Sequence, residues 1–254
     1  MERTNNKILL LTDSRGRGIA SLLHDRTLAH EPPTIWEEII LPGATLETLH
    51  QRLERSQRRK KWDLVIIIGG ICDFTTRIKD RKARKLEYSS SKTEEVKQVI
   101  ENILEQQGNK VQICTLTPAS ITKYNSKFNS EGATERDSEE QKQLIQDVEE
   151  LNHFIATSNI RRDLPTIDLA RQSYRASLKT QGNRKKRILK FTDKDLTDGV
   201  HPSNHLRETW ANYMAPVVTK ILKKMEDKRN EEPSSSETEE EEPESWNFKR
   251  QQNH

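Results

Sequence analysis

Residues 63–70 read Asp-Leu-Val-Ile-Ile-Ile-Gly-Gly, and this short stretch decides the fold. Its five consecutive apolar residues, most of them β-branched, favour a strand, and the two glycines that follow favour its end. A strand without polar alternation is typical of a parallel sheet that is covered on both faces. The stretch therefore predicts a central strand of such a sheet.

The sequence on either side alternates between strand and helix patterns. Four more strands are predicted by apolar runs at residues 7–12, 36–41, 111–116 and 166–169. Amphipathic helical patterns lie at residues 46–53, 96–104, 144–155 and 206–225. Pro216 is expected to kink or divide the last helix. The alternation predicts an α/β fold with three α/β/α layers around a five-stranded, mostly parallel, flavodoxin-like sheet.

The charge of the chain is divided between a basic body and an acidic end. The 254 residues hold 43 Lys and Arg against 40 Asp and Glu, a formal charge of +3. Eight of these acids lie in residues 231–244, which have no Lys, Arg or apolar residue, so the rest has 43 basic and 32 acidic residues and a charge of +11. We predict one domain over residues 1–226 and a disordered acidic tail over residues 227–254.

The composition excludes several classes of protein. No run of 18 apolar residues predicts a membrane span, and the first residues do not resemble a secretory signal. Cys72 and Cys114 are too few for a disulfide framework or a four-cysteine zinc site. These features predict an intracellular protein, cytoplasmic or nuclear, that is not secreted.

Three long polar connections follow predicted strands, at residues 74–91, 119–137 and 171–195. Each one emerges at the carboxyl edge of the sheet, where open α/β sheets bind their ligands. Long connections without a function are uncommon in compact domains. Functional residues are therefore expected at this edge.

Two short motifs at this edge have residues suited to nucleophilic catalysis. Ser14 directly follows the first strand, so its hydroxyl and its N–H group lie at a strand-to-helix turn, although a serine there is also an ordinary helix cap. Asp198 and His201 stand three residues apart in a turn before the last helix. That spacing lets the carboxylate bind one ring nitrogen and leaves the other free to act as a base, although Asp-x-x-His also occurs as a simple turn.

Two glycine motifs complete the set. Gly43 ends the second strand, and Gly-Ile-Cys-Asp at residues 70–73 ends the third. In this order the four motifs resemble the sequence blocks of the SGNH (GDSL-like) hydrolases, and the resemblance covers residues 7–225. The matching segments are Thr-Asp-Ser-Arg-Gly at 12–16, Pro-Gly-Ala-Thr at 42–45, Gly-Ile-Cys-Asp at 70–73 and Asp-Gly-Val-His at 198–201. The second and last segments are also similar to SGNH-like domains of animal retroelement and viral open reading frames.

The resemblance implies a serine ester hydrolase with a catalytic triad. Ser14 corresponds to the nucleophile, His201 to the base and Asp198 to the residue that orients the base. The substrate is an unidentified ester, which the basic surroundings suggest to be anionic. No metal or organic cofactor is expected.

The oxyanion site is where the chain departs most from the family pattern. The resemblance implies that the N–H groups of Ser14 and Gly43 bind the oxyanion together with the side chain at position 72. The family has Asn there, whereas this chain has Cys72, and a thiol is a weak donor. Loss of one such donor typically costs a factor of about 100 to 1,000 in turnover. Cys72 is expected to be either a buried structural thiol or, less in keeping with its neighbours, a nucleophile.

The substrate rim is expected to include Arg15, Asp73 and Arg77, which lie in or near the matching segments. In the first segment, Thr12 stands where the family has Gly, and Arg15 stands where it has Leu.

A function of another class is compatible with the same residues. A catalytically weakened module of this fold could bind nucleic acid or protein through the basic loops at residues 77–85 and 184–187. The second of these loops also resembles a nuclear-import signal.

Overall fold

A parallel sheet forms the centre of the molecule. The structure is a computed structural model that describes residues 5–27, 33–79, 84–90, 92–181 and 184–231. Its main sheet has the strand order β2-β1-β3-β6, and all pairings in it are parallel. These strands are β1 (Asn6–Thr12), β2 (Thr34–Ile40), β3 (Leu64–Ile68) and β6 (Val111–Ile113). The predicted α/β class is confirmed.

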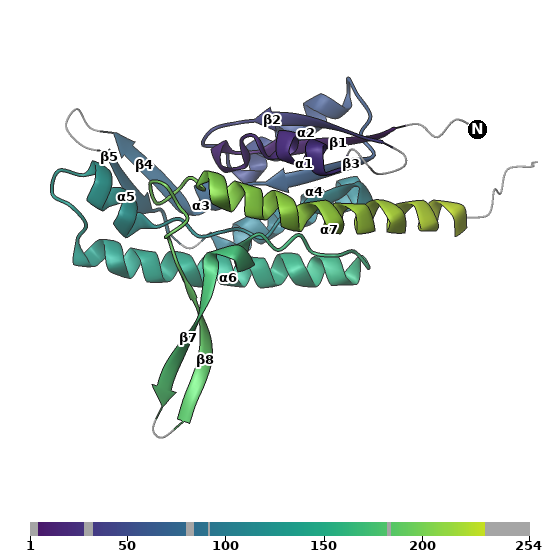
Figure 1. Ribbon diagram of the computed structural model, residues 1–254. Coiled ribbons are helices and arrows are strands. Elements are labelled where there is room, and N and C mark those ends of the chain that lie inside the picture. The colour runs from purple at the N-terminus through teal and green to yellow at the C-terminus, as the bar shows by residue number, and fades with distance from the viewer. Residues whose placement is uncertain (1–4, 28–32, 80–83, 91, 182–183, 232–254) are drawn as a thin grey trace, which may run out of the picture.

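Helices cover both faces of this sheet, as Figure 1 shows. On β1, Leu9 and Leu11 belong to one buried cluster, whereas Ile8 and Leu10 belong to another on the opposite face. The first cluster is completed by α2 (Leu46–Gln57), α4 (Thr93–Gln107) and α6 (Glu135–Arg161), and the second by α1 (Ile19–Thr27) and α7 (Asn204–Glu231). All five residues of β3 are buried because both faces are covered, which explains their continuous apolar run.

The predicted fifth strand is wrong, because residues 166–169 are not a strand in the structure. One backbone hydrogen bond, from the Thr115 N–H to the Ile167 carbonyl at 3.0 Å, joins them to the chain after β6. The N–H of Asp168 instead donates to the Tyr213 hydroxyl at 3.3 Å, and the Asp168 carboxylate accepts from the Thr115 hydroxyl at 2.8 Å. Side chains thus take the backbone partners that a strand ladder needs.

Two of the three predicted loops are antiparallel ribbons. β4 (Thr75–Lys79) pairs with β5 (Arg84–Tyr88), and β7 (Tyr174–Gln181) pairs with β8 (Arg184–Phe191). The ribbon β7–β8 extends away from the rest of the molecule (Figure 1). The third loop contains α5 (Ile121–Phe128). The basic segments expected in loops at 77–85 and 184–187 therefore lie in or between strands.

Short elements complete the chain. They are η1 (Ser14–Gly16), α3 (Ile71–Phe74), η2 (Gly108–Lys110) and η3 (Ala170–Ser173). In the described ranges no helix is long and apolar enough to span a membrane.

The last helix is longer than the sequence pattern predicted. α7 continues through Pro216, which is exposed, and ends at Glu231. An exposed proline is tolerated because the carbonyl four residues earlier can turn toward water. Residues 227–231, predicted to begin the tail, are helical. The remaining predicted tail, residues 232–254, lies outside the described residues.

Candidate active site

The carboxyl edge of the sheet brings three chain segments together. Ser14 follows β1 in η1, Gly43 follows β2, and Cys72 lies in α3 directly after β3. The strands are parallel neighbours, so their carboxyl ends meet at one edge. The loop that carries Asp198 and His201 leads into α7 at the same edge, as its contact with Ser14 shows.

Ser14, His201 and Asp198 form a continuous chain of hydrogen bonds. The Oγ of Ser14 lies 3.0 Å from Nε2 of His201, and Nδ1 of His201 lies 2.8 Å from Oδ2 of Asp198. The second carboxylate oxygen of Asp198 accepts the N–H groups of His201 at 2.8 Å and Val200 at 2.9 Å. One carboxylate therefore shapes the turn and also orients the imidazole ring.

The hydrogen bonds to Asp198 keep its carboxyl group ionised. Partial burial alone would raise the pKa of Asp198. The hydrogen bond from the His201 ring and those from the two backbone N–H groups outweigh burial and hold this pKa well below its usual range. The ionised carboxylate favours the tautomer of His201 that donates from Nδ1 and leaves Nε2 to accept a proton from Ser14.

The turn that holds Asp198 and His201 is packed against α5. Gly199 has a φ of +87°, and a Cβ there would lie 2.5 Å from the Ser120 carbonyl and 2.8 Å from the Tyr124 N. The Ser120 N–H donates to the Gly199 carbonyl at 2.6 Å. Glycine is thus required at position 199 both for its backbone conformation and for this close approach.

Asp13, and not Ser14, caps the turn after β1. The Asp13 carboxylate accepts the Arg15 N–H at 2.8 Å and the Arg15 Nε at 3.3 Å. The Arg15 guanidinium also donates to the Thr117 carbonyl at 2.7 Å, and Arg15 is only 3% exposed. Arg15 therefore lies beneath the surface and holds the nucleophile turn, rather than lying on the expected substrate rim. The acid two residues before it was a signal that sequence reasoning missed.

Thr12 and Gly16 compensate for each other in this turn. The Thr12 hydroxyl donates to the Ile68 carbonyl at 2.9 Å and accepts the Gly16 N–H at 3.1 Å. A Cβ at Gly16 would lie 2.1 Å from that hydroxyl. The Thr12 side chain therefore occupies space that is free only because Gly16 has no Cβ. The Thr12 hydroxyl also links the turn that carries Ser14 to β3.

Backbone donors are available near Ser14. Gly43 has a φ of +78° and is exposed, and among the described residues the N–H groups of Ser14 and Gly43 donate to no carbonyl of the turns and loops. Burial, followed by the charge of Asp13, raises the pKa of the Cys72 thiol to about 11. Cys72 is thus protonated at neutral pH, which makes it a poor nucleophile and leaves its S–H a weak donor.

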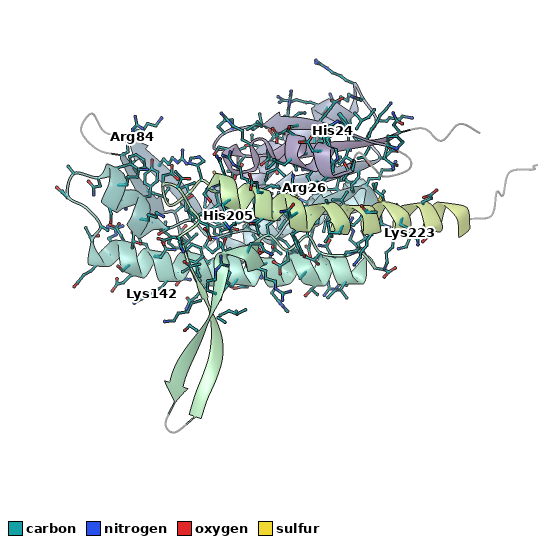
Figure 2. The ribbon with its side chains drawn as sticks, viewed as in Figure 1. His24, Arg26, Arg84, Lys142, His205 and Lys223 are labelled. Carbon is teal, nitrogen blue, oxygen red and sulfur yellow. The ribbon has the colours of Figure 1, made fainter. Side chains whose placement is uncertain are left out.

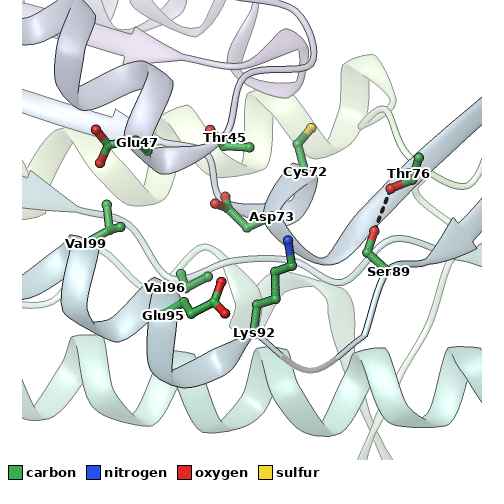
Figure 3. Close-up of a pocket in the computed structure, with 10 residues that line it drawn as sticks. All are labelled: Thr45, Glu47, Cys72, Asp73, Thr76, Ser89, Lys92, Glu95, Val96 and Val99. Carbon is green, nitrogen blue, oxygen red and sulfur yellow. Dashed lines mark hydrogen bonds between the residues drawn. The ribbon is translucent and has the colours of Figure 1, made fainter.

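A cavity of about 270 Å³ adjoins Cys72 (Figure 3). It is lined mainly by polar and charged groups, namely Thr45, Glu47, Cys72, Asp73, Thr76, Ser89, Lys92 and Glu95, together with Val96 and Val99. The Asp73 carboxylate accepts the Leu46 N–H at 3.0 Å, and the Lys92 side chain extends toward it in Figure 3. Burial outweighs that backbone hydrogen bond and raises the pKa of Asp73 to about 6. Asp73 therefore changes charge near neutral pH.

Arg77 lies at the outer side of the same region. It is exposed on β4, and its guanidinium lies 5.7 Å from the Tyr124 ring centroid, a cation–π distance. Its charge acts on the pKa of Cys72. The role of Arg77 at a substrate rim stays a prediction.

Other histidines of the described chain are away from this arrangement. His24 and His205 are exposed on α1 and α7 (Figure 2), and His50 is bound to Gln106 at 3.0 Å. No group of three or more His, Cys, Asp or Glu in the described ranges has the arrangement of a metal site. His201 is therefore the histidine placed to serve Ser14.

Comparison with known proteins identifies the family of the chain. The chain matches the family model of the GDSL-like lipase/acylhydrolases over residues 11–214. No curated protein sequence matches it. Similar solved structures include a lipase/acylhydrolase from Enterococcus faecalis, which is 20% identical, with 86% of this chain and 96% of that one covered and a TM-score of 0.59.

Two further structures have the same fold. The psychrotrophic esterase EstA from a Pseudoalteromonas species is 11% identical, with 86% of this chain and 100% of that one covered and a TM-score of 0.55. An acetyl xylan esterase, AlAXEase, is 16% identical, with 84% and 99% covered and a TM-score of 0.53. The family model spans most of the described domain, and on that ground the chain belongs to the GDSL-like lipases and acylhydrolases, a family of ester hydrolases.

Proposed function

We propose that this protein hydrolyses a carboxylic ester through a triad of Ser14, His201 and Asp198. The observation that carries the proposal is the continuous hydrogen-bond chain from the Ser14 hydroxyl through His201 to an ionised Asp198. Such a chain aligns a nucleophile, a base and a residue that holds the base in one tautomer. It forms at the edge of the sheet where ligands of open α/β folds bind.

The proposed reaction has two steps. In the first, Ser14 Oγ attacks the ester carbonyl as its proton passes to His201 Nε2, and His201 then gives that proton to the departing alcohol. In the second, His201 takes a proton from water, the hydroxide attacks the acyl-enzyme, and the proton returns to Ser14 Oγ as the acid leaves. Asp198 stays ionised throughout and stabilises the imidazolium that forms in each step.

The negative charge on the carbonyl oxygen needs donors in both steps. The N–H groups of Ser14 and Gly43 are proposed for this role, with the Cys72 thiol as a weaker third donor. The raised pKa of Cys72 keeps its proton in place, so the thiol does not add a competing negative charge. The proposal therefore predicts an active but slow enzyme.

The cavity beside Cys72 suggests the size of the group that the site accepts. Cys72 joins this cavity to the proposed oxyanion donors, whereas Ser14 and His201 do not line it. If the acyl group of the substrate enters it, a volume of about 270 Å³ suits a short group better than a long hydrocarbon chain. Its carboxyl groups, from Glu47, Asp73 and Glu95, favour hydroxyl groups as partners. An acetyl xylan esterase is among the similar structures, so acetylated polyhydroxyl compounds are the substrates to try first.

A fluorophosphonate probe tests the catalytic proposal directly. The purified chain is expected to be labelled and to hydrolyse p-nitrophenyl acetate faster than p-nitrophenyl decanoate. The Ser14→Ala variant should show neither labelling nor turnover while its circular dichroism spectrum and its elution volume stay unchanged. A folded wild-type protein without labelling or turnover would overturn the proposal.

The alternative of a weakened binding module stays a second proposal. Its support is the basic sequence of the two ribbons at residues 77–85 and 184–187, and its partners would be nucleic acid or protein. The narrower likeness to retroelement and viral domains and the intracellular location belong with this proposal. Absence of Ser14-dependent chemistry together with salt-dependent binding of nucleic acid would favour it over the enzyme.

A further inference from the structure

The ribbon β7–β8 is an arm that the fold does not need for its core. Its strands form eight residue pairs, from Tyr174–Phe191 at the base to Gln181–Arg184. The arm extends away from the sheet and its covering helices (Figure 1). Two-stranded ribbons are marginally stable by themselves, so an arm of this length needs a base that is held firmly.

The base of the arm is held by several contacts. The Tyr174 and Phe191 rings meet edge to face with centroids 6.1 Å apart. The Thr192 N–H donates to the Ser173 carbonyl at 2.9 Å. The side chain of Arg175 binds the Asp195 carboxylate at 3.1 Å. These contacts fix the direction of the arm where it leaves the domain.

The charge of the arm has one sign. Its two strands contain no Asp or Glu and seven basic residues: Arg175, Lys179, Arg184, Lys185, Lys186, Arg187 and Lys190. The register pairs Arg175 with Lys190, Lys179 with Lys186, and Gln181 with Arg184. Paired positions of an antiparallel ribbon lie on the same face, and positions two residues apart share that face. These three pairs therefore share one face with the uncharged pair Ser177–Ile188. One face of the arm therefore has five of the seven basic positions.

A row of like charges on a narrow ribbon costs stability unless a polyanion neutralises it. Like charges directly opposite each other in a ribbon are destabilising. Lys179 is paired with Lys186 in this way, and Arg175 is paired with Lys190 but also binds Asp195. From the Arg175 pair to the Gln181 pair, the row extends over about 20 Å. A nucleic-acid duplex presents phosphates continuously over that length.

We propose that the β7–β8 arm binds double-stranded DNA through phosphate contacts along its basic face. The major groove of B-form DNA is about 12 Å wide and admits a two-stranded ribbon, whereas the A-form groove of RNA is deep and narrow. Single-strand binding relies on aromatic stacking, and the aromatic residues of the arm, Tyr174 and Phe191, pack on each other at its base. This inference deepens the second proposal above, because it names one ribbon and one kind of nucleic acid, and it does not depend on the proposed esterase activity.

The same sequence argues against a membrane as the partner. A ribbon that inserts into a bilayer carries its apolar residues at the outer end. Here the positions from Lys179 to Gln181 and from Arg184 to Arg187 contain no apolar residue, and exposed Leu189 lies nearer the base. The arrangement suits contact with phosphates at the outer end.

Fluorescence anisotropy with a labelled 20-base-pair DNA duplex tests the proposal on the full chain. The variant K179Q/R184Q/K186Q removes three charges from the basic face. The control R58Q/R59Q/K61Q removes three exposed charges that follow α2, so the net charge of the two variants is equal. We expect the arm variant to bind at least about tenfold more weakly and to lower the salt slope by about 2 to 3, since each phosphate contact contributes about 0.9. The control should change affinity by less than twofold.

A shortened arm provides a second test that does not rely on charge substitution. Ala176 and Leu189 are directly paired, so replacing residues 177–188 by Asn-Gly closes the ribbon with a two-residue turn in the same register. This variant should lose DNA binding and keep its turnover of p-nitrophenyl acetate. Equal losses in the arm and control variants would overturn the proposal. So would tighter binding to single-stranded RNA, or binding to phosphatidylserine vesicles but not to the duplex.

Discussion

The carboxyl edge of the sheet and the β7–β8 arm are two regions of this molecule that are built in opposite ways. At the edge, Ser14, His201 and Asp198 are fixed by short hydrogen bonds and by a glycine that no other residue can replace. The arm is held at its base, and the rest of it is defined by register and by charge. A site that makes and breaks bonds needs fixed distances, whereas a surface that contacts phosphates needs charge within reach.

The difference predicts how each region responds to substitution. Loss of one group at the edge should abolish most of the activity, because the triad acts as a unit. Loss of one charge on the arm should weaken DNA affinity only partly, and the difference in affinity from wild type should become smaller as the salt concentration rises. A gradual loss of activity at the edge, or a complete loss of binding after removal of one arm charge, would contradict this difference between the two regions.

The largest effect is expected from Ser14→Ala. Without the nucleophile, turnover of p-nitrophenyl acetate should fall by a factor of about 10⁴ or more. Duplex binding should be unchanged, since Ser14 is not part of the arm. Steady-state kinetics and anisotropy on the same preparation measure both quantities. A change in DNA affinity would mean that the edge and the arm are not separate.

The next effect is a gain from Cys72→Asn. An amide is a stronger donor than a thiol, so the substitution should raise kcat by about 100-fold, which corresponds to about 2.7 kcal/mol. The KM should change less, because the donor acts mainly on the oxyanion. Cys72→Ser, which has a short hydroxyl, is the matched control and should give a smaller gain. Equal or lower kcat for the Asn variant would show that position 72 does not face the oxyanion.

A third prediction compares the two ribbons. The docked ribbon β4–β5 is fixed by Asn125, which is fully buried, accepts the Leu86 N–H at 2.8 Å and donates to the Leu86 carbonyl at 3.0 Å. Asn125→Ala leaves both backbone groups without these partners and should lower the free energy of unfolding by about 2 kcal/mol. Ser177→Ala on the arm should change it by less than about 0.5 kcal/mol. Urea denaturation measures both, and equal values would mean that the ribbons are held alike.

The smallest effect concerns the pH dependence of stability at Asp73. Burial raises its pKa to about 6 in the folded chain, above an unfolded value of about 3.9. Asp73 therefore binds its proton more tightly in the folded chain than in the unfolded chain. This contributes to the free energy of unfolding below about pH 4, and the contribution is lost as the pH rises through about 6. The rise in the pKa of Asp73 corresponds to at most about 2.8 kcal/mol, and solvent screening of this half-buried carboxyl reduces that value, so Asp73→Asn should gain about 1 kcal/mol relative to wild type between pH 4 and pH 7. A difference that does not change with pH would place Asp73 in a more solvated position.

The sequence predicted the buried layers of the fold better than its exposed parts. The run at residues 64–68 is a strand because burial on both faces demands apolar residues there, and that demand is visible in the sequence. Residues 166–169 also contain apolar residues, yet the Tyr213 hydroxyl accepts the Asp168 N–H and donates to the Thr166 carbonyl, which a strand would use for its ladder. Competition of this kind depends on residues far apart in the chain.

The ribbons were missed for a different reason. Strands that are not covered by helices have no apolar alternation, so a run such as Arg-Lys-Lys-Arg at 184–187 is typical of a loop. At the edge of the sheet, the order of four short motifs led to Ser14, Asp198 and His201, and the structure brings these residues together. Arg15 was expected on the rim because an arginine is usually exposed, but a buried Asp13 binds it.

The contacts at the base of the arm have a consequence for which parts of the chain can change in length and composition. Asp193 follows the arm directly, and it accepts the Ser120 hydroxyl at 2.6 Å while its carbonyl accepts the Lys123 ammonium at 2.8 Å. These contacts, with the Thr192–Ser173 bond, close the connection before it reaches Asp198. The length and composition of the arm are therefore decoupled from the position of His201. The strands β7 and β8 can therefore be shortened or replaced without moving His201 away from Ser14.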